Sequence, residues 1–175
     1  GRDQRGLFVR DQFSRDTQLA MGHPAARGEY YHLYLNGHYW GLFNSCERPE
    51  ASYGGIYFGG DKDEYDVIKV NTGRNMFSSD SYSIMATDGN LRAWRRLWDV
   101  TEAGLEDNEP YFRLQGKDAY GRDDPNHEAL LDIVNLIDYM LVIFYGGNMD
   151  APISKFAGNR RTNNWYGLRH RDGAD

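Results

Sequence analysis

The residues best suited to chemistry lie in the segment GGNMDAP, where Asp150 follows the glycine pair 146–147 at the end of an apolar run. A loop that leaves a packed helix is held rigidly, and a catalytic acid or base needs rigid positioning. Asn163 and Asn164 come next, just before a predicted strand. An aspartate that orients or deprotonates a hydroxyl, with an asparagine oxygen for a hard Mg²⁺ ion, is the chemistry of phosphoryl transfer. The same side chains could instead satisfy the backbone of turns.

A second candidate set lies in the first half of the chain. Glu47 and Arg48 end the second strand of a predicted hairpin, and Lys69 lies in the next strand. In kinases a strand lysine paired with a glutamate holds the phosphates of ATP. Exposed ion pairs have the same sequence signature. Glu47, Arg48 and Lys69 are therefore candidates for cofactor binding, with a surface ion pair as the alternative.

The composition excludes several classes of protein. The 20 Lys and Arg against 26 Asp and Glu give a formal net charge of −6, which argues against nucleic-acid binding, since that favours a basic footprint. A single cysteine, Cys46, excludes an internal disulfide and a cysteine-cluster metal site. No apolar run approaches the length of a membrane-spanning helix. The 175 residues suit one domain, and the oligomeric state stays open.

Two elements should position the candidate residues. Residues 29–46 predict a hairpin, because Asn36-Gly37 between two aromatic runs is typical of a type I′ turn. Asp124-Pro125 predicts the start of the longest helix, with Asp as N-cap and Pro at the first helical position. A wide apolar face should make this helix the core of the domain. Its residues are Leu130, Ile133, Val134, Ile137, Met140, Leu141 and Phe144.

The remaining elements follow from periodicity and from turn residues. We expect helices at 7–21 and 90–101, strands at 65–70 and 165–171, a short helix or loop at 51–60, and irregular chain at 71–89 and 105–123. The sequence therefore predicts an α+β fold, in which an antiparallel hairpin-based sheet packs on a long core helix.

Four segments in order resemble the CotH kinase family, the proteins similar to spore coat protein H. They are HLYLNGHYWGLFNSCERPE, YFGGDKDEYDVIK, NLIDYMLVIFYGGNMDAP and NNWYGLR. The resemblance implies an incomplete, atypical protein-kinase-like fold. It also implies transfer of phosphate from ATP, with Mg²⁺ or Mn²⁺, to Ser or Thr of a protein substrate. Asp150 falls on the family's catalytic-loop aspartate, Asn164 or Asn163 on its metal-binding pair, and Glu47 on a glutamate near the nucleotide.

The sequence also departs from the family pattern. The segment ISKFAGNRRT separates Asp150 from the asparagine pair, which lies closer in many members. From the resemblance, we expect the family's second metal-binding aspartate to fall outside the chain. We therefore expect residues 1–175 to be the central part of one CotH-like kinase domain, truncated at both ends and inactive as a fragment. The resemblance implies a bacterial protein that is exported or at the cell surface in its full length.

A non-catalytic function is the main alternative. The hairpin carries Tyr31, Tyr39 and Trp40, and exposed aromatic rings stack on sugars or anchor protein interfaces. The chain would then be a binding module or a pseudokinase that recognises a protein or a carbohydrate. Core packing would explain the same aromatic residues.

Overall fold

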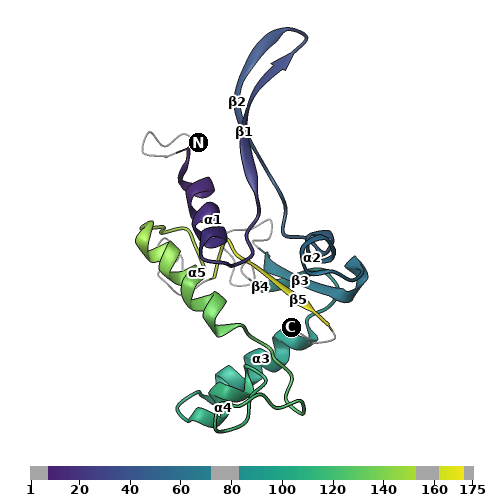
Figure 1. Ribbon diagram of the computed structural model, residues 1–175, viewed down its shortest axis with the longest axis vertical. Coiled ribbons are helices and arrows are strands. Elements are labelled where there is room, and N and C mark those ends of the chain that lie inside the picture. The colour runs from purple at the N-terminus through teal and green to yellow at the C-terminus, as the bar shows by residue number, and fades with distance from the viewer. Residues whose placement is uncertain (1–7, 72–82, 153–161, 172–175) are drawn as a thin grey trace.

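The computed structural model describes residues 8–71, 83–152 and 162–171 (Figure 1). The described chain has mixed α and β structure, as the sequence predicts. Its elements, in order, are α1 (Arg10–Ala20), β1 (Gly28–Leu35), β2 (His38–Cys46), α2 (Ala51–Phe58), the 3₁₀ turn η1 (Lys62–Glu64), β3 (Tyr65–Asn71), β4 (Ser83–Asp88), α3 (Arg92–Ala103), α4 (Asn108–Arg113), α5 (Ile133–Tyr145) and β5 (Tyr166–His170). None of the helices in these ranges is long and apolar enough to cross a membrane.

The core lies on a three-stranded antiparallel sheet with strand order β4-β3-β5. The central strand β3 contains Val67, which is fully buried, and Tyr65, whose exposed fraction is 1%. Ala51 of α2 packs with both residues. Burying these side chains is the main favourable free energy available to this part of the fold.

The β1–β2 hairpin is a separate two-stranded sheet that projects from the rest of the chain (Figure 1). Asn36 and Gly37 both have positive φ, 51° and 82°, as the predicted type I′ turn requires. The prediction that the main sheet is based on this hairpin is wrong. The sheet consists instead of the consecutive strands β3 and β4 and of β5, which comes from near the end of the chain.

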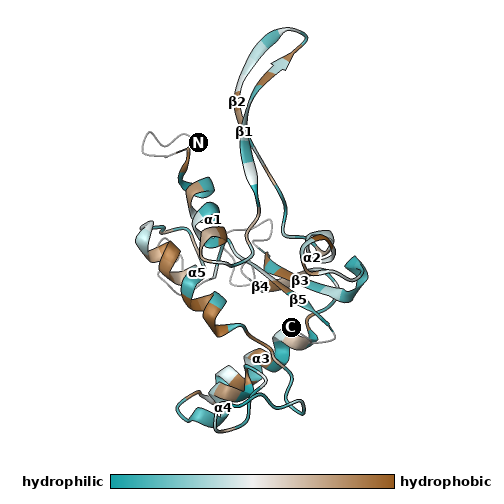
Figure 2. Cartoon of the chain, viewed as in Figure 1, coloured by the Kyte–Doolittle hydropathy of each residue, from teal (hydrophilic) through white to brown (hydrophobic). Residues whose placement is uncertain are grey.

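The predicted long core helix is shorter and more exposed than expected. α5 begins at Ile133, after Asp132, whose carboxylate accepts a 2.8 Å hydrogen bond from the Asn135 N–H. Val142 and Ile143 are its buried residues, whereas Val134, Ile137, Leu141 and Phe144 are exposed. Figure 2 shows hydrophobic residues along much of this helix. The apolar periodicity indicates a helix but does not indicate how much of its face the described chain covers.

Asp124-Pro125 starts a turn rather than a helix. The Asp124 carboxylate accepts hydrogen bonds from the backbone and the side chain of Asn126, at 2.9 and 2.8 Å. Further along, the N–H groups of Leu130 and Leu131 both donate to the Leu114 carbonyl. Because Leu114 is 1% exposed, this segment is held by a buried contact that competes with helical bonding.

Two more segments differ from their sequence predictions. β4 lies within residues 71–89 and pairs with β3, although the segment is predicted to be irregular. α4 lies within the acidic stretch 105–123. β4 is stabilised by its pairing with the preceding strand β3, and the pattern of residues 71–89 alone does not contain that partner.

Candidate functional site

Asp150 lies in the loop that follows α5. The helix ends at the Gly146 cap, and Gly147 has a φ of 57°, which turns the chain out of the helix. The Asp150 N–H then donates a 3.0 Å hydrogen bond to the side-chain oxygen of Asn148. This bond closes a small turn that fixes the backbone at Asp150.

The structure brings Asn163 and Asn164 to Asp150. The Asn163 side-chain amide donates to Asp150 Oδ1 at 2.6 Å. The Asn164 side-chain amide donates to the Asp150 backbone carbonyl at 3.0 Å. The three residues that the sequence assigns to one site are therefore in contact, in spite of the sequence that separates them.

A tight turn presents the asparagine pair. Asn164 has a φ of 46°, a left-handed conformation that asparagine tolerates better than most residues. The indole N–H of Trp165 donates to the Thr162 hydroxyl across this turn. The Trp165 ring also lies 5.5 Å from the Trp94 ring of α3, centroid to centroid. The start of β5 and the packing of α3 thus hold the pair in place.

Among the described residues, the hydrogen bonds around Asp150 leave one side-chain oxygen without a donor. Its backbone N–H, its backbone carbonyl and Oδ1 are each bonded to an asparagine, whereas Oδ2 has no hydrogen bond within the described residues. Asp150 and Asn164 are exposed, and Asn163 is 6% exposed. The site therefore presents a fixed carboxylate to solvent.

The oxygen atoms of this site are suited to a hard divalent cation. Mg²⁺ binds through one or two protein oxygens and keeps several waters. The carbonyl oxygen of Asn164 is available for such a role, because its amide nitrogen makes the bond to Asp150. Within the described ranges, no three His, Cys, Asp or Glu side chains form a larger metal-binding group.

Glu47 lies in a different part of the structure. Its Oε2 accepts the backbone N–H of Arg27 at 2.8 Å, and its Oε1 accepts the Tyr57 hydroxyl. The Arg27 guanidinium lies 4.4 Å from the Tyr57 ring centroid. The Tyr57 hydrogen bond is the main cause that lowers the pKa of the Glu47 carboxyl, with smaller contributions from Arg27.

The other two candidate residues do not join Glu47. Lys69 lies in the central strand, opposite Met85 of β4 and Tyr166 of β5. Arg48 pairs with Glu50, at 3.2 Å from Nε to Oε1. In the described part of the chain, no ion pair joins Lys69 to Glu47. The predicted lysine–glutamate pair is therefore not formed in this structure.

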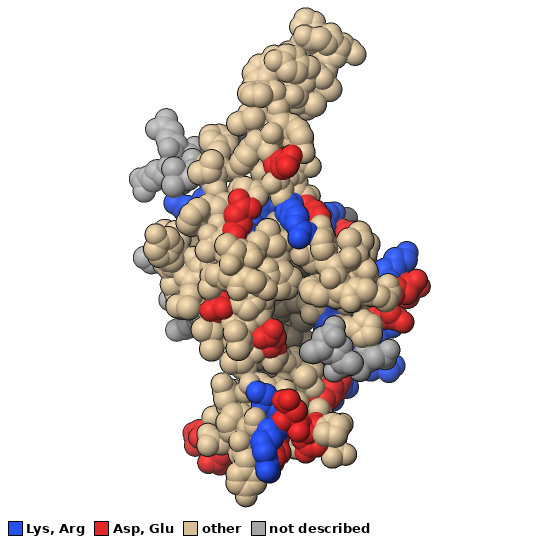
Figure 3. All heavy atoms as spheres, viewed as in Figure 1, with Lys and Arg blue, Asp and Glu red and all other residues tan. Residues whose placement is uncertain are grey.

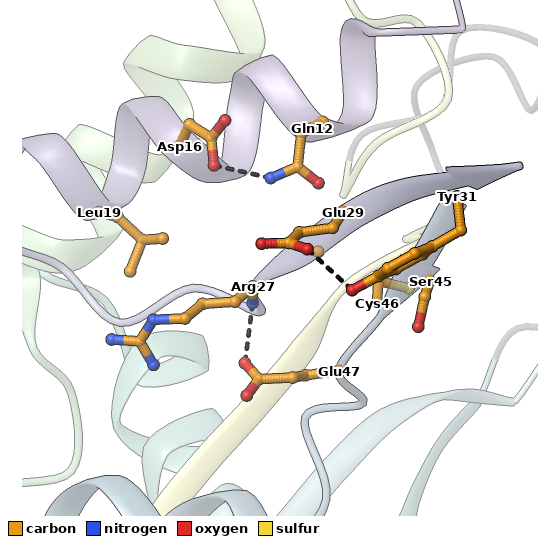
Figure 4. Close-up of a pocket in the computed structure, with 10 residues that line it drawn as sticks. Gln12, Asp16, Leu19, Arg27, Glu29, Tyr31, Ser45, Cys46 and Glu47 are labelled. Atoms are coloured by element: carbon orange, nitrogen blue, oxygen red, sulfur yellow. Dashed lines mark hydrogen bonds between the residues drawn. The ribbon is translucent and has the colours of Figure 1, made fainter. Parts of the chain in front are cut away.

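A cleft of about 430 Å³ lies between α1 and the base of the hairpin (Figure 4). Glu47 lines it, together with residues that the sequence analysis does not single out. These are Gln12, Asp16, Leu19, Arg27, Gly28, Glu29 and Ser45, and the lining also includes Tyr31 and Cys46. Three of the lining side chains are carboxylates and one is a guanidinium. No local pattern indicates this cleft, because α1 and the hairpin meet only in the folded chain.

Removing the Tyr57 hydroxyl should raise the pKa of Glu47. In Tyr57→Phe the carboxylate loses its main hydrogen bond, so its ionised form is less favoured. A lowered folded-state pKa stabilises the fold above the ordinary pKa, and this contribution is lost as the pH falls. At a pH above the ordinary carboxyl pKa, the variant should therefore have a lower free energy of unfolding than the parent. The difference should be less than about 1 kcal/mol, because solvent screens the site.

Carboxyl NMR titration of both proteins measures this change directly. Tyr31→Phe is the matched control, because the Tyr31 hydroxyl bonds to Glu29 in the same cleft. An unchanged Glu47 titration in Tyr57→Phe would show that the tyrosine does not control this group.

Comparisons with known proteins identify the family. No curated protein and no solved structure is matched by the chain. The family described as CotH kinase protein matches residues 1–172, nearly the whole sequence. The matched range confirms the predicted family resemblance. The chain therefore belongs to the CotH kinase family.

Proposed function

We propose that this chain carries the site for transfer of phosphate from ATP to a Ser or Thr hydroxyl of a protein substrate. Family membership supports a kinase-like function. The observation that carries the proposal is the fixation of Asp150 by three asparagine side chains, which leaves Oδ2 open to a substrate. Positioning of this kind is what phosphoryl transfer requires from a protein.

In this proposal Asp150 Oδ2 accepts the proton of the substrate hydroxyl. The hydroxyl oxygen forms the new bond to the γ-phosphorus, the bond from that phosphorus to the bridging oxygen breaks, and ADP leaves. Asn164 would hold Mg²⁺ or Mn²⁺ through its side-chain oxygen. The bound ion would neutralise charge on the phosphate oxygens.

Three further residues are proposed to bind the nucleotide. Glu47, Arg48 and Lys69 would contact the bound nucleotide. Glu47 is held by Arg27 and Tyr57, which supports a fixed carboxylate at the cleft edge. Lys69 is only partly buried in β3, and a strand lysine of this kind can reach a phosphate.

The test is transfer of labelled phosphate from ATP to a mixture of Ser- and Thr-containing proteins. The chain is assayed together with whatever sequence flanks it in the natural protein. We expect labelling that requires Mg²⁺ or Mn²⁺ and stops when the metal is chelated. A folded protein that transfers no phosphate to any of these proteins or to itself would contradict the proposal.

A second candidate function is supported by the surface of the hairpin. Residues 30–46 contain no Lys, Arg, Asp or Glu, and Figure 3 shows the projecting part without charged residues. Tyr31, Tyr39 and Trp40 are 53%, 54% and 64% exposed. A neutral aromatic surface is suited to a carbohydrate or an uncharged protein surface. The chain would then be a binding module or a pseudokinase.

Trp40→Ala separates the two functions. If the hairpin binds a neutral glycan or protein, this variant should lose at least about tenfold in affinity, as an aromatic anchor does. Binding to an array of neutral glycans and to immobilised proteins measures the effect. Tyr120→Ala is the control, because Tyr120 is 82% exposed but lies outside the hairpin. Equal binding by parent and Trp40→Ala would exclude the hairpin as the binding surface.

A further inference from the structure

We propose that Asn163 is a positioning residue for Asp150 and not a ligand of the metal. The inference rests on the proposed phosphoryl transfer. It gives the two neighbouring asparagines different roles, although the sequence presents them as one pair. Asn163 would set the orientation of the Asp150 carboxylate, and Asn164 would remain the residue that binds the cation.

The contacts of the two side chains support this division. Asn163 donates to a carboxylate oxygen of Asp150 at 2.6 Å, so its bond acts on the reacting group itself. Asn164 donates to the backbone carbonyl of Asp150 at 3.0 Å, so its bond fixes the backbone of the loop and not the carboxylate. Hydrogen bonds to ionised groups are stronger than those between neutral groups. The Asn163 bond is therefore the one that determines where the carboxylate points.

Burial distinguishes the two residues in the same way. Asn163 is 6% exposed, whereas Asn164 is exposed. Mg²⁺ loses its water reluctantly and binds proteins with several waters still attached. An exposed side-chain oxygen suits such a hydrated ion, and a buried one does not. The two adjacent side chains also reach different atoms of Asp150, the carboxylate oxygen and the backbone carbonyl.

The consequence for chemistry is an asymmetric carboxylate. Asn163 engages Oδ1, and Oδ2 is left for the substrate proton. Because the amide is neutral, it orients the carboxylate without neutralising its charge. No ion pair is formed by Asp150 within the described residues, so the three asparagines provide its hydrogen-bonded surroundings.

The experiment compares Asn163→Ala, Asn163→Asp and Asn164→Ala with the parent protein. Asn163→Ala should lower kcat by about ten- to a hundredfold, the range expected for a lost hydrogen bond to a charged group. KM for ATP and the dissociation constant for Mn²⁺ alone should stay unchanged. Asn163→Asp keeps the shape but places a carboxylate against Asp150, so it should lower kcat at least as much.

Asn164→Ala is the matched control, because it should weaken Mn²⁺ binding while Asn163→Ala does not. A metal ligand at position 163 would behave in the opposite way, since Asn163→Ala would then weaken Mn²⁺ binding. That result overturns the inference, as does an Asn163→Ala variant with unchanged kcat. Circular dichroism first confirms that each variant is folded. If Asn163→Ala does not fold, the kcat of Asn163→Asp provides the test instead. A parent without phosphoryl transfer contradicts the proposed function itself.

Discussion

Asp150→Asn should lower the rate of phosphoryl transfer by about 10²- to 10⁴-fold, the usual contribution of a general acid or base. The substitution keeps the size of the side chain and an oxygen that can accept the bond from Asn163. It removes the negative charge and the basic oxygen that would take the substrate proton. KM for ATP should change little, because in this proposal Asp150 acts on the hydroxyl and not on the nucleotide.

Single-turnover transfer of labelled phosphate measures this effect. Asp63→Asn makes the same carboxylate-to-amide change at an exposed position in η1, and it should retain the parent rate. The thermal unfolding midpoint should be alike in all three proteins, since Asp150 is exposed. Equal transfer by the parent and Asp150→Asn would show that another residue, or a contaminating kinase, performs the reaction.

Tyr65→Ala should reduce the free energy of unfolding by about 3–5 kcal/mol, as expected for removal of a buried aromatic side chain. The Tyr65 ring is 1% exposed and packs so closely under α2 that a Cβ added to Gly54 would lie 2.6 Å from it. The hydroxyl also donates to the Gly59 carbonyl at 2.7 Å. The variant would leave a cavity between α2 and the central strand.

Tyr65→Phe separates the ring from its hydroxyl. It should cost only about 0.5–1.5 kcal/mol, because one hydrogen bond is lost and the ring remains. Urea unfolding followed by tryptophan fluorescence gives both values. Equal destabilisation by the two substitutions would mean that the hydroxyl, and not the packed ring, stabilises this region.

Local patterns predict the elements whose signals are contained within a few residues. Asn36-Gly37 specifies its turn because both residues adopt positive φ at little cost. Gly22, with a φ of 87°, ends α1 for the same reason. The strand at 165–171 is confirmed as β5, and the helix at 90–101 is confirmed, with a small shift, as α3.

The prediction fails where a distant residue competes with a local preference. Asp124-Pro125 has the residues of a helix start, but the Asp124 carboxylate closes a turn and the chain beyond it bonds to Leu114. The apolar face of α5 is exposed, although its sequence pattern predicts a buried core helix. Periodicity reports that one side of a helix is apolar, but which surface covers that side depends on the rest of the fold.

The candidate site also has features that the sequence predicts and features that it does not. The sequence by itself determined which residue types are available: one aspartate after a glycine-ended helix, and an asparagine pair before a strand. Only the tertiary structure decided that both asparagines contact Asp150, that one is buried and the other exposed, and that Glu47 and Lys69 are not paired. The physical reason is that hydrogen-bond partners and burial depend on distances between segments, and those distances arise only when the loop after α5 meets the turn before β5.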